Sequence, residues 1–168
     1  VNNAAAGASD ALTITMNANA GTDVGAATVA NVETLTIDVS EATASATVQA
    51  ATIGLTLTQT TVANSGSGAA QTVNIVGTES LTIDTAVAAN TVDASGMGSR
   101  LATAAGLTMS TVVTATAAIA GQTVTGSGGV DTLYGSTGGD TISGGAGADT
   151  IVSSTGADTI DGGAGLDT

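Results

Sequence analysis

GSGGVDTLY (126–134), GSTGGDTIS (135–143), GGAGADTIV (144–152), SSTGADTID (153–161) and GGAGLDT (162–168) repeat one nine-residue unit, whose last copy is incomplete. Every unit has a glycine at position four and an aspartate at position six, and each complete unit has an aliphatic residue at position eight. The aspartates are Asp131, Asp140, Asp149, Asp158 and Asp167. A fixed period of this length is typical of stacked repeats, each of which adds one short strand and one turn to a common core.

If each unit forms a turn of six residues and a strand of three, two units return the chain to its starting edge. Aspartates two units apart then share an edge, with Asp131, Asp149 and Asp167 in one column and Asp140 and Asp158 in the other. Coils stack at about 4.8 Å, and bare carboxylates at this range repel one another. Calcium accepts six to eight oxygen ligands in flexible geometry, so we expect Ca²⁺ between the turns.

Glycine at position four suits turn carbonyls that point toward an ion, because a β-carbon would obstruct the backbone angles required. Serine replaces glycine at position two in three units, and in one of these also at position one, and we expect weaker or more strained sites there: Ser127, Ser136, Ser154 and Ser153. Between each aspartate and its aliphatic residue stands a threonine, which must point outward. These threonines favour strands and solubility; the alternative is a flat hydroxyl array that orders ice.

The composition excludes several classes of function. Fourteen acids stand against one cation, Arg100, for a net charge of −13, which disfavours nucleic acid and anionic lipid as partners. No apolar run is long enough to insert in a membrane. The chain has no Cys, His or Lys, so neither a Ser-His pair nor a zinc-histidine site can form within it, and we expect no enzymatic activity.

Residues 1–125 are rich in Ala and Thr and carry short alternating runs at 10–15, 32–38, 53–58 and 78–84, which predict strands. Their leucines recur at nearly even spacing, which favours loose coils of one solenoid over the alternative, an antiparallel sandwich: Leu12, Leu35, Leu57 and Leu81. The Thr and Val content of 101–121 favours strand over helix. We therefore predict an all-β fold, a right-handed parallel β-solenoid over 1–125 that ends in a calcium-binding β-roll over 126–168. The incomplete last unit suggests a piece of a longer chain.

Four acids bracket the two LTID segments in the same way: Glu33, Asp38, Glu79 and Asp84. Acids at strand ends usually keep sheet edges soluble and unpaired. Further calcium sites there are the alternative.

With these residues described, the chain resembles the RTX proteins that Gram-negative bacteria export by type I secretion, through the nonapeptides of 126–168. VETLTIDVS (32–40), NTVDASGMGS (90–99) and AGQTVTGSGGVDTLYG (120–135) look more particularly like RTX surface-layer proteins. This resemblance implies a secreted structural module at the cell surface. Calcium would drive its folding and its assembly into a two-dimensional homo-oligomeric lattice, with a polysaccharide anchor that we do not assign. The alternative is an RTX adhesin or the accessory β-roll of a secreted hydrolase.

The resemblance also implies the ligands of each calcium ion. One turn would give its aspartate and the carbonyls of positions one and three, and the turn two units later would give its aspartate and the carbonyls of positions two and four. The three implied sets are Gly126, Gly128 and Asp131 with Gly145, Gly147 and Asp149; Gly135, Thr137 and Asp140 with Ser154, Gly156 and Asp158; and Gly144, Ala146 and Asp149 with Gly163, Gly165 and Asp167.

Overall fold

The structure is a computed structural model that describes residues 11–16, 22–30, 32–40, 50–58, 72–83, 89–100, 103–104, 107–109, 121–135, 138–153 and 155–168. These residues form strands and turns and contain no helix, and accordingly no membrane-crossing helix is found among them. The runs predicted as strands are strands, and the described parts of 101–121 are β9 and β10 (Thr103–Ala104 and Leu107–Met109).

Two parallel sheets form the body of the molecule. One contains, in spatial order, β1 (Ala11–Thr15), β3 (Thr34–Val39), β5 (Thr72–Gly77), β7 (Thr91–Met97), β11 (Thr123–Thr125), β13 (Thr141–Ser143) and β15 (Thr159–Asp161). The other contains β14 (Thr150–Val152), β12 (Thr132–Tyr134), β10, β6 (Ser80–Ile83), β4 (Ala50–Thr58) and β2 (Thr22–Ala30).

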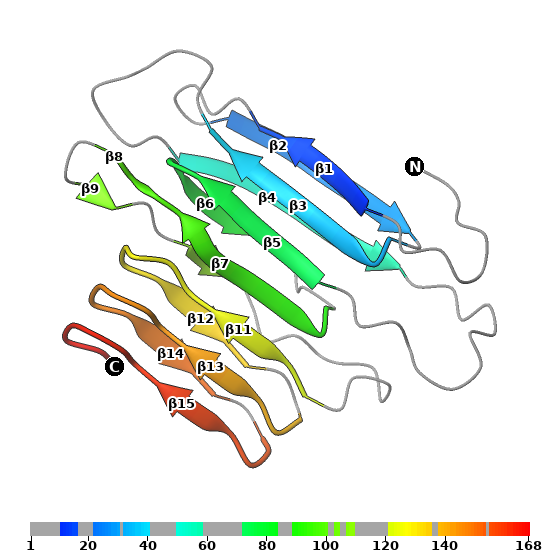
Figure 1. Cartoon of the computed structure of the whole chain (residues 1–168). Coiled ribbons are helices and arrows are strands. Elements are labelled where there is room, and N and C mark those ends of the chain that lie inside the picture. The colour runs from blue at the N-terminus through cyan, green and yellow to red at the C-terminus, as the bar shows by residue number, and fades with distance from the viewer. Residues whose placement is uncertain are drawn as a thin grey trace.

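The chain visits the two sheets in turn, so a pair of successive strands makes one coil of a solenoid, and the coils stack from the N-terminal to the C-terminal part (Figure 1). Every pairing within these sheets is parallel, which excludes the antiparallel sandwich. Among the described residues, the only antiparallel pairing joins β8 (Ser99–Arg100) to β9. The predicted all-β parallel solenoid is therefore confirmed.

The evenly spaced leucines belong to coils of one solenoid, as the sequence predicts, but they do not form a single column. Leu12 and Leu35 are in register in the seven-stranded sheet. Leu57 and Leu81 lie in the other sheet, where they pair with Val29 and Ala51. Because each coil contributes a strand to both sheets, strands of similar sequence can lie in different sheets, and of these leucines Leu12 and Leu35 alone are in register with each other.

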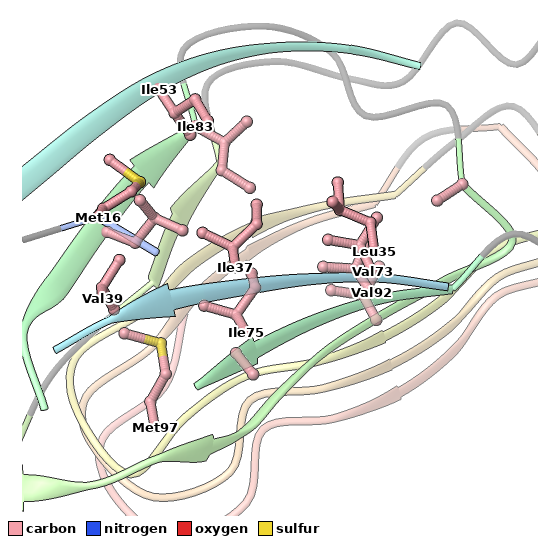
Figure 2. Packing of buried hydrophobic residues seen from close by; sticks show 14 of the residues in the cluster. Met16, Leu35, Ile37, Val39, Ile53, Val73, Ile75, Ile83, Val92 and Met97 are labelled. Atoms are coloured by element: carbon pink, nitrogen blue, oxygen red, sulfur yellow. The ribbon is translucent and has the colours of Figure 1, made fainter. Parts of the chain in front are cut away.

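The core lies between the sheets and is made of aliphatic columns. Leu35, Val73 and Val92 are stacked in register, and Ile37 stacks on Ile75 (Figure 2). Ile53 and Ile83, from the opposite sheet, are also fully buried. The alternation of buried and half-buried residues along β3 follows the two-residue period of a strand, so its threonines lie on the outer face and its aliphatics fill the core.

Coils differ in length between the two parts of the chain. Thr34 pairs with Thr72, and Thr72 pairs with Thr91, so the first of these two coils is twice as long as the second. From Thr123 onward every step in register spans two nonapeptides, as between Thr123 and Thr141. The sheets nevertheless continue from one part to the other, because β11 pairs with β7 and β12 with β10.

Candidate metal centre

Each strand of the C-terminal roll has three residues, which leaves six for each turn, as the nonapeptide predicts. Thr132 is in register with Thr150, and Thr141 with Thr159. The aspartates that precede these threonines therefore stack in two columns, one at the start of β12 and β14 and the other at the start of β13 and β15. We call Asp131, Asp149 and Asp167 the first column, and Asp140 and Asp158 the second column.

The same type of hydrogen bond, from a backbone N–H to a carboxylate, links successive aspartates in each column. The backbone N–H of Asp131 donates to Oδ1 of Asp149 at 2.9 Å, and that of Asp149 donates to Oδ1 of Asp167 at 3.1 Å. In the second column Asp140 N–H donates to Oδ1 of Asp158 at 3.0 Å. Each of these accepting carboxylates thus turns inward, toward the preceding coil, instead of outward to water.

Burial leaves one carboxylate oxygen without a hydrogen bond. Asp131, Asp140 and Asp149 are at most 1% exposed. Oδ1 of Asp149 accepts from Asp131, whereas its Oδ2 is buried and accepts no hydrogen bond. A buried carboxylate oxygen without a donor is costly, and a cation would remove that cost. The Asp149 carboxylate therefore fits a metal ligand better than a purely structural acid.

The glycines of the turns are required by close stacking. Gly145, Gly147, Gly163 and Gly165 have φ of +99°, +139°, +90° and +151°. A Cβ on any of them would collide with a carbonyl of the turn two units earlier, namely that of Ser127, Gly129, Gly145 and Gly147 respectively. Gly156, with φ of +147°, stands in the same way against Gly138. The turns therefore approach each other backbone to backbone, which brings many carbonyl oxygens to the two edges.

Position-one glycines make room for the aspartates. A Cβ on Gly126, Gly135 or Gly144 would lie 2.6, 2.8 or 2.5 Å from Oδ2 of the aspartate of the same unit. The carboxylates are thus folded back over the start of their own turns. Gly128, in contrast, has open space where its Cβ would stand.

Ser127 holds the Asp131 carboxylate at the head of the first column. Its backbone N–H and its hydroxyl both donate to Asp131, at 2.7 Å each, to Oδ2 and Oδ1 respectively. The Ser127 carbonyl accepts from Ala146 N–H at 3.2 Å. The Ser127 hydroxyl therefore holds this turn in a way that glycine cannot.

Some of the implied calcium ligands lie in turns that the structure describes, and others do not. Ala146 forms a parallel bridge with Ala164, and the Gly145 carbonyl accepts from Ala164 N–H at 2.9 Å, so this turn is paired with the next one along the column. Thr137 and Ser154, together with Ser136, lie outside the described residues. Among described residues no three acidic side chains gather in one place. Any ion between two coils would thus meet at most two carboxylates and would depend on backbone carbonyls for its other ligands, as calcium often does.

Among the described residues, the acids around the LTID segments form no group of three that could hold a metal ion. Glu33 directly precedes β3, whereas Glu79 follows β5 and its N–H donates to Val39, the last residue of β3. Glu79 is fully buried, and Asp38, which is buried only in part, accepts from the Ser40 hydroxyl. Asp84 lies outside the described residues. The described residues give no support to a further calcium site here.

Sequence reasoning missed Gln122, which occupies an aspartate position of the second column. Its N–H donates to Oδ1 of Asp140 at 2.6 Å, the same bond that joins Asp140 to Asp158. The signal was present in the sequence, because QTVT stands one unit before DTLY and keeps the threonine and aliphatic positions.

Comparison with protein families agrees with this geometry. Residues 125–160 and 143–168 match the model of the RTX calcium-binding nonapeptide repeat in four copies. RTX nonapeptide repeats bind calcium, and proteins that carry them are typically secreted by type I systems. The match covers about a quarter of the chain and supports its place among RTX proteins. Neither the curated proteins nor the solved structures gave a match.

Proposed function

We propose that the chain is a structural module of a secreted, calcium-dependent bacterial surface protein, of the surface-layer type. Its C-terminal roll would remain unfolded at low calcium and close on calcium outside the cell. The buried Asp149 carboxylate, whose Oδ2 has no hydrogen-bond donor, carries this proposal.

Calcium would act by replacing repulsion with attraction. The columns bring acids together along a narrow body, and the chain has a single Arg and no Lys to neutralise them. Extracellular calcium modules bind at about 10⁻⁴–10⁻³ M. Because a site built from stacked turns does not exist in the unfolded chain, the free energy of binding contributes directly to folding. A cytoplasm poor in calcium would then keep the roll unfolded, the form in which it could pass a secretion channel.

The ligand sets remain part of this proposal. In the first column, Asp131 and Asp149 would share one ion, and Asp149 and Asp167 the next. In the second column, Asp140 and Asp158 would share an ion. The backbone carbonyls of positions one and three of one turn, and of positions two and four of the turn two units later, would complete the coordination.

The surface-layer role is supported by composition and by the form of the module. The chain is rich in Ala, Thr and Gly and has no cysteine, and its described residues build a stack of coils rather than a pocket for small molecules. In-register threonines line the outer face of the seven-stranded sheet, from Thr34 through Thr72 and Thr91 to Thr159. Such a body is suited to side-by-side packing in a lattice.

Two measurements test the proposal. Far-UV circular dichroism of the isolated chain should show strand signal that rises with calcium and falls on addition of a chelator; strand signal indifferent to calcium would refute the folding step. Electron microscopy of the native cell surface should then show a periodic sheet that chelation disperses. A calcium-dependent fold without such a sheet would favour the adhesin or the accessory roll.

A further inference from the structure

The second column does not begin at Asp140. The residue before each strand of the seven-stranded sheet occupies one continuous edge, and in the described part of the chain these residues are Glu33, Asn90, Gln122, Asp140 and Asp158. The backbone carbonyls of the first four accept from the threonine N–H of the following coil, as Asn90 does from Thr123 and Gln122 from Thr141. Two carboxamides, Asn90 and Gln122, therefore stand directly before the two aspartates along this edge.

Gln122 makes one hydrogen bond toward the roll and one toward the upstream coils. Toward the roll, its backbone N–H donates to Oδ1 of Asp140 at 2.6 Å. Toward the upstream coils, its side-chain Nε2 donates to the carbonyl of Ala89 at 2.9 Å. Ala89 is fully buried and Gln122 is 2% exposed, so water does not compete for either bond.

A glutamate could not take this place. In the roll, a carboxylate accepts a bond from the N–H of the coil above it. At Gln122 the side chain meets a carbonyl oxygen instead, and only a donor can satisfy it. An ionised carboxylate buried against the Ala89 carbonyl would face a second acceptor without a proton between them. The bond to the Ala89 carbonyl thus requires an amide of glutamine length.

We propose that Gln122, beside the pairing of β11 with β7, passes calcium-driven order in the roll to the coil directly upstream. An ion shared by Asp140 and Asp158 orders the Asp140 carboxylate, which accepts from the Gln122 backbone N–H. The Gln122 side-chain amide in turn donates to Ala89, which lies just before β7. This inference rests on the proposed calcium-dependent folding of the roll.

Hydrogen–deuterium exchange of the full chain, with calcium and with chelator, tests the inference. In the wild type, calcium should slow exchange in β11 to β15 and also in β7. In Gln122→Met, which keeps the length of the side chain and removes its donor, the roll should still respond to calcium. The calcium-linked gain in protection of β7 should be about tenfold smaller, as expected for loss of a buried hydrogen bond.

The calcium-linked difference separates this role from a merely structural one. If Gln122 only stabilised the fold, Gln122→Met would lower the protection of β7 equally with and without calcium, and the inference would be overturned. It would also be overturned if β7 of the wild type did not respond to calcium while the roll did. If the roll itself did not respond, the proposed function would fail first.

A second variant guards against loss of folding. Gln122→Asn keeps the amide but is one methylene shorter, so it cannot reach the Ala89 carbonyl from the same backbone position. It should reproduce the uncoupling of β7 with a smaller disturbance of packing. Retention of the full calcium response of β7 in Gln122→Asn would overturn the inference even if Gln122→Met did not fold.

Discussion

β3 and β12 belong to one solenoid, yet β3 buries more aliphatic side chains, whereas β12 follows a buried carboxylate. The six residues of β3 bury three aliphatic side chains, Leu35, Ile37 and Val39, each of them fully. The three residues of β12 bury only Leu133, and the residue before the strand is the equally buried Asp131. Since a buried aliphatic side chain contributes about 1.5–3 kcal/mol, the wide upstream coils can be held by their core. The narrow coils of the roll need another source of cohesion, and their columns of acids point to calcium.

Removal of calcium should separate the two regions most sharply. With a chelator, amides in β11 to β15 should lose protection from hydrogen exchange by about a hundredfold or more, because metal binding supplies their folding free energy. Amides in β3 and β5 should change little. Equal loss in both regions would show that the upstream coils depend on the ion as well, and loss in neither would remove the role of calcium.

Ile37→Ala should destabilise the upstream coils to the same extent with and without calcium. Ile37 is fully buried and stacked on Ile75, so its truncation should lower the free energy of unfolding of the upstream coils by about 2–5 kcal/mol. Urea unfolding should give the same loss in calcium and in chelator. Thr36→Ala, on the outer face of the same strand, is the control and should cost much less. A loss confined to one calcium condition would break the distinction between the regions.

Gly147→Ala should damage only the roll. Its φ of +139° disfavours any β-carbon, and the new methyl group would press on the Gly129 carbonyl. The strain should cost about 1–3 kcal/mol in thermal or urea unfolding of the roll at saturating calcium. Gly128→Ala is a matched control in a turn of the same column, because nothing lies within 4 Å of its added carbon. Equal tolerance of both substitutions would contradict the close stacking of the turns.

Asp149→Asn should weaken calcium binding without unfolding the rest of the chain. In the proposed ligand sets Asp149 serves the ions on both sides of its turn, so loss of its charge should lower the calcium affinity roughly tenfold. Isothermal titration calorimetry would measure the change. Asp161→Asn removes the same charge from an exposed side chain outside the columns, and its affinity should stay near that of the wild type. An equal loss of calcium affinity in both variants would show that only the net charge matters and would contradict the role of Asp149 as a ligand.

The parts of the structure that the sequence predicts are those in which the repeat is short and strict. A nonapeptide leaves no freedom in how turns and strands divide, so the two columns and the outward threonines follow from position alone. Thr141 and Thr150 are exposed while Ile142 is buried, as the nonapeptide predicts.

The upstream register could not be derived in the same way. A long coil from Thr34 to Thr72 is followed there by one of half its length, and an alternating apolar pattern shows that a strand faces the core without showing in which sheet it lies. Gln122 was overlooked for a different reason. Its amide replaces the carboxylate used to recognise the repeat, and the need for a donor at that place arises from Ala89, which lies far from it in sequence.

The bonds between aspartates give the roll a direction. Each accepting carboxylate takes its bond from the main chain of the coil before it, and the same sense holds for Asp131 with Asp149 and for Asp140 with Asp158. The two ends of the stack are therefore unlike: a coil added after the last one would meet backbone N–H donors, whereas a coil placed before the roll meets carboxylate acceptors.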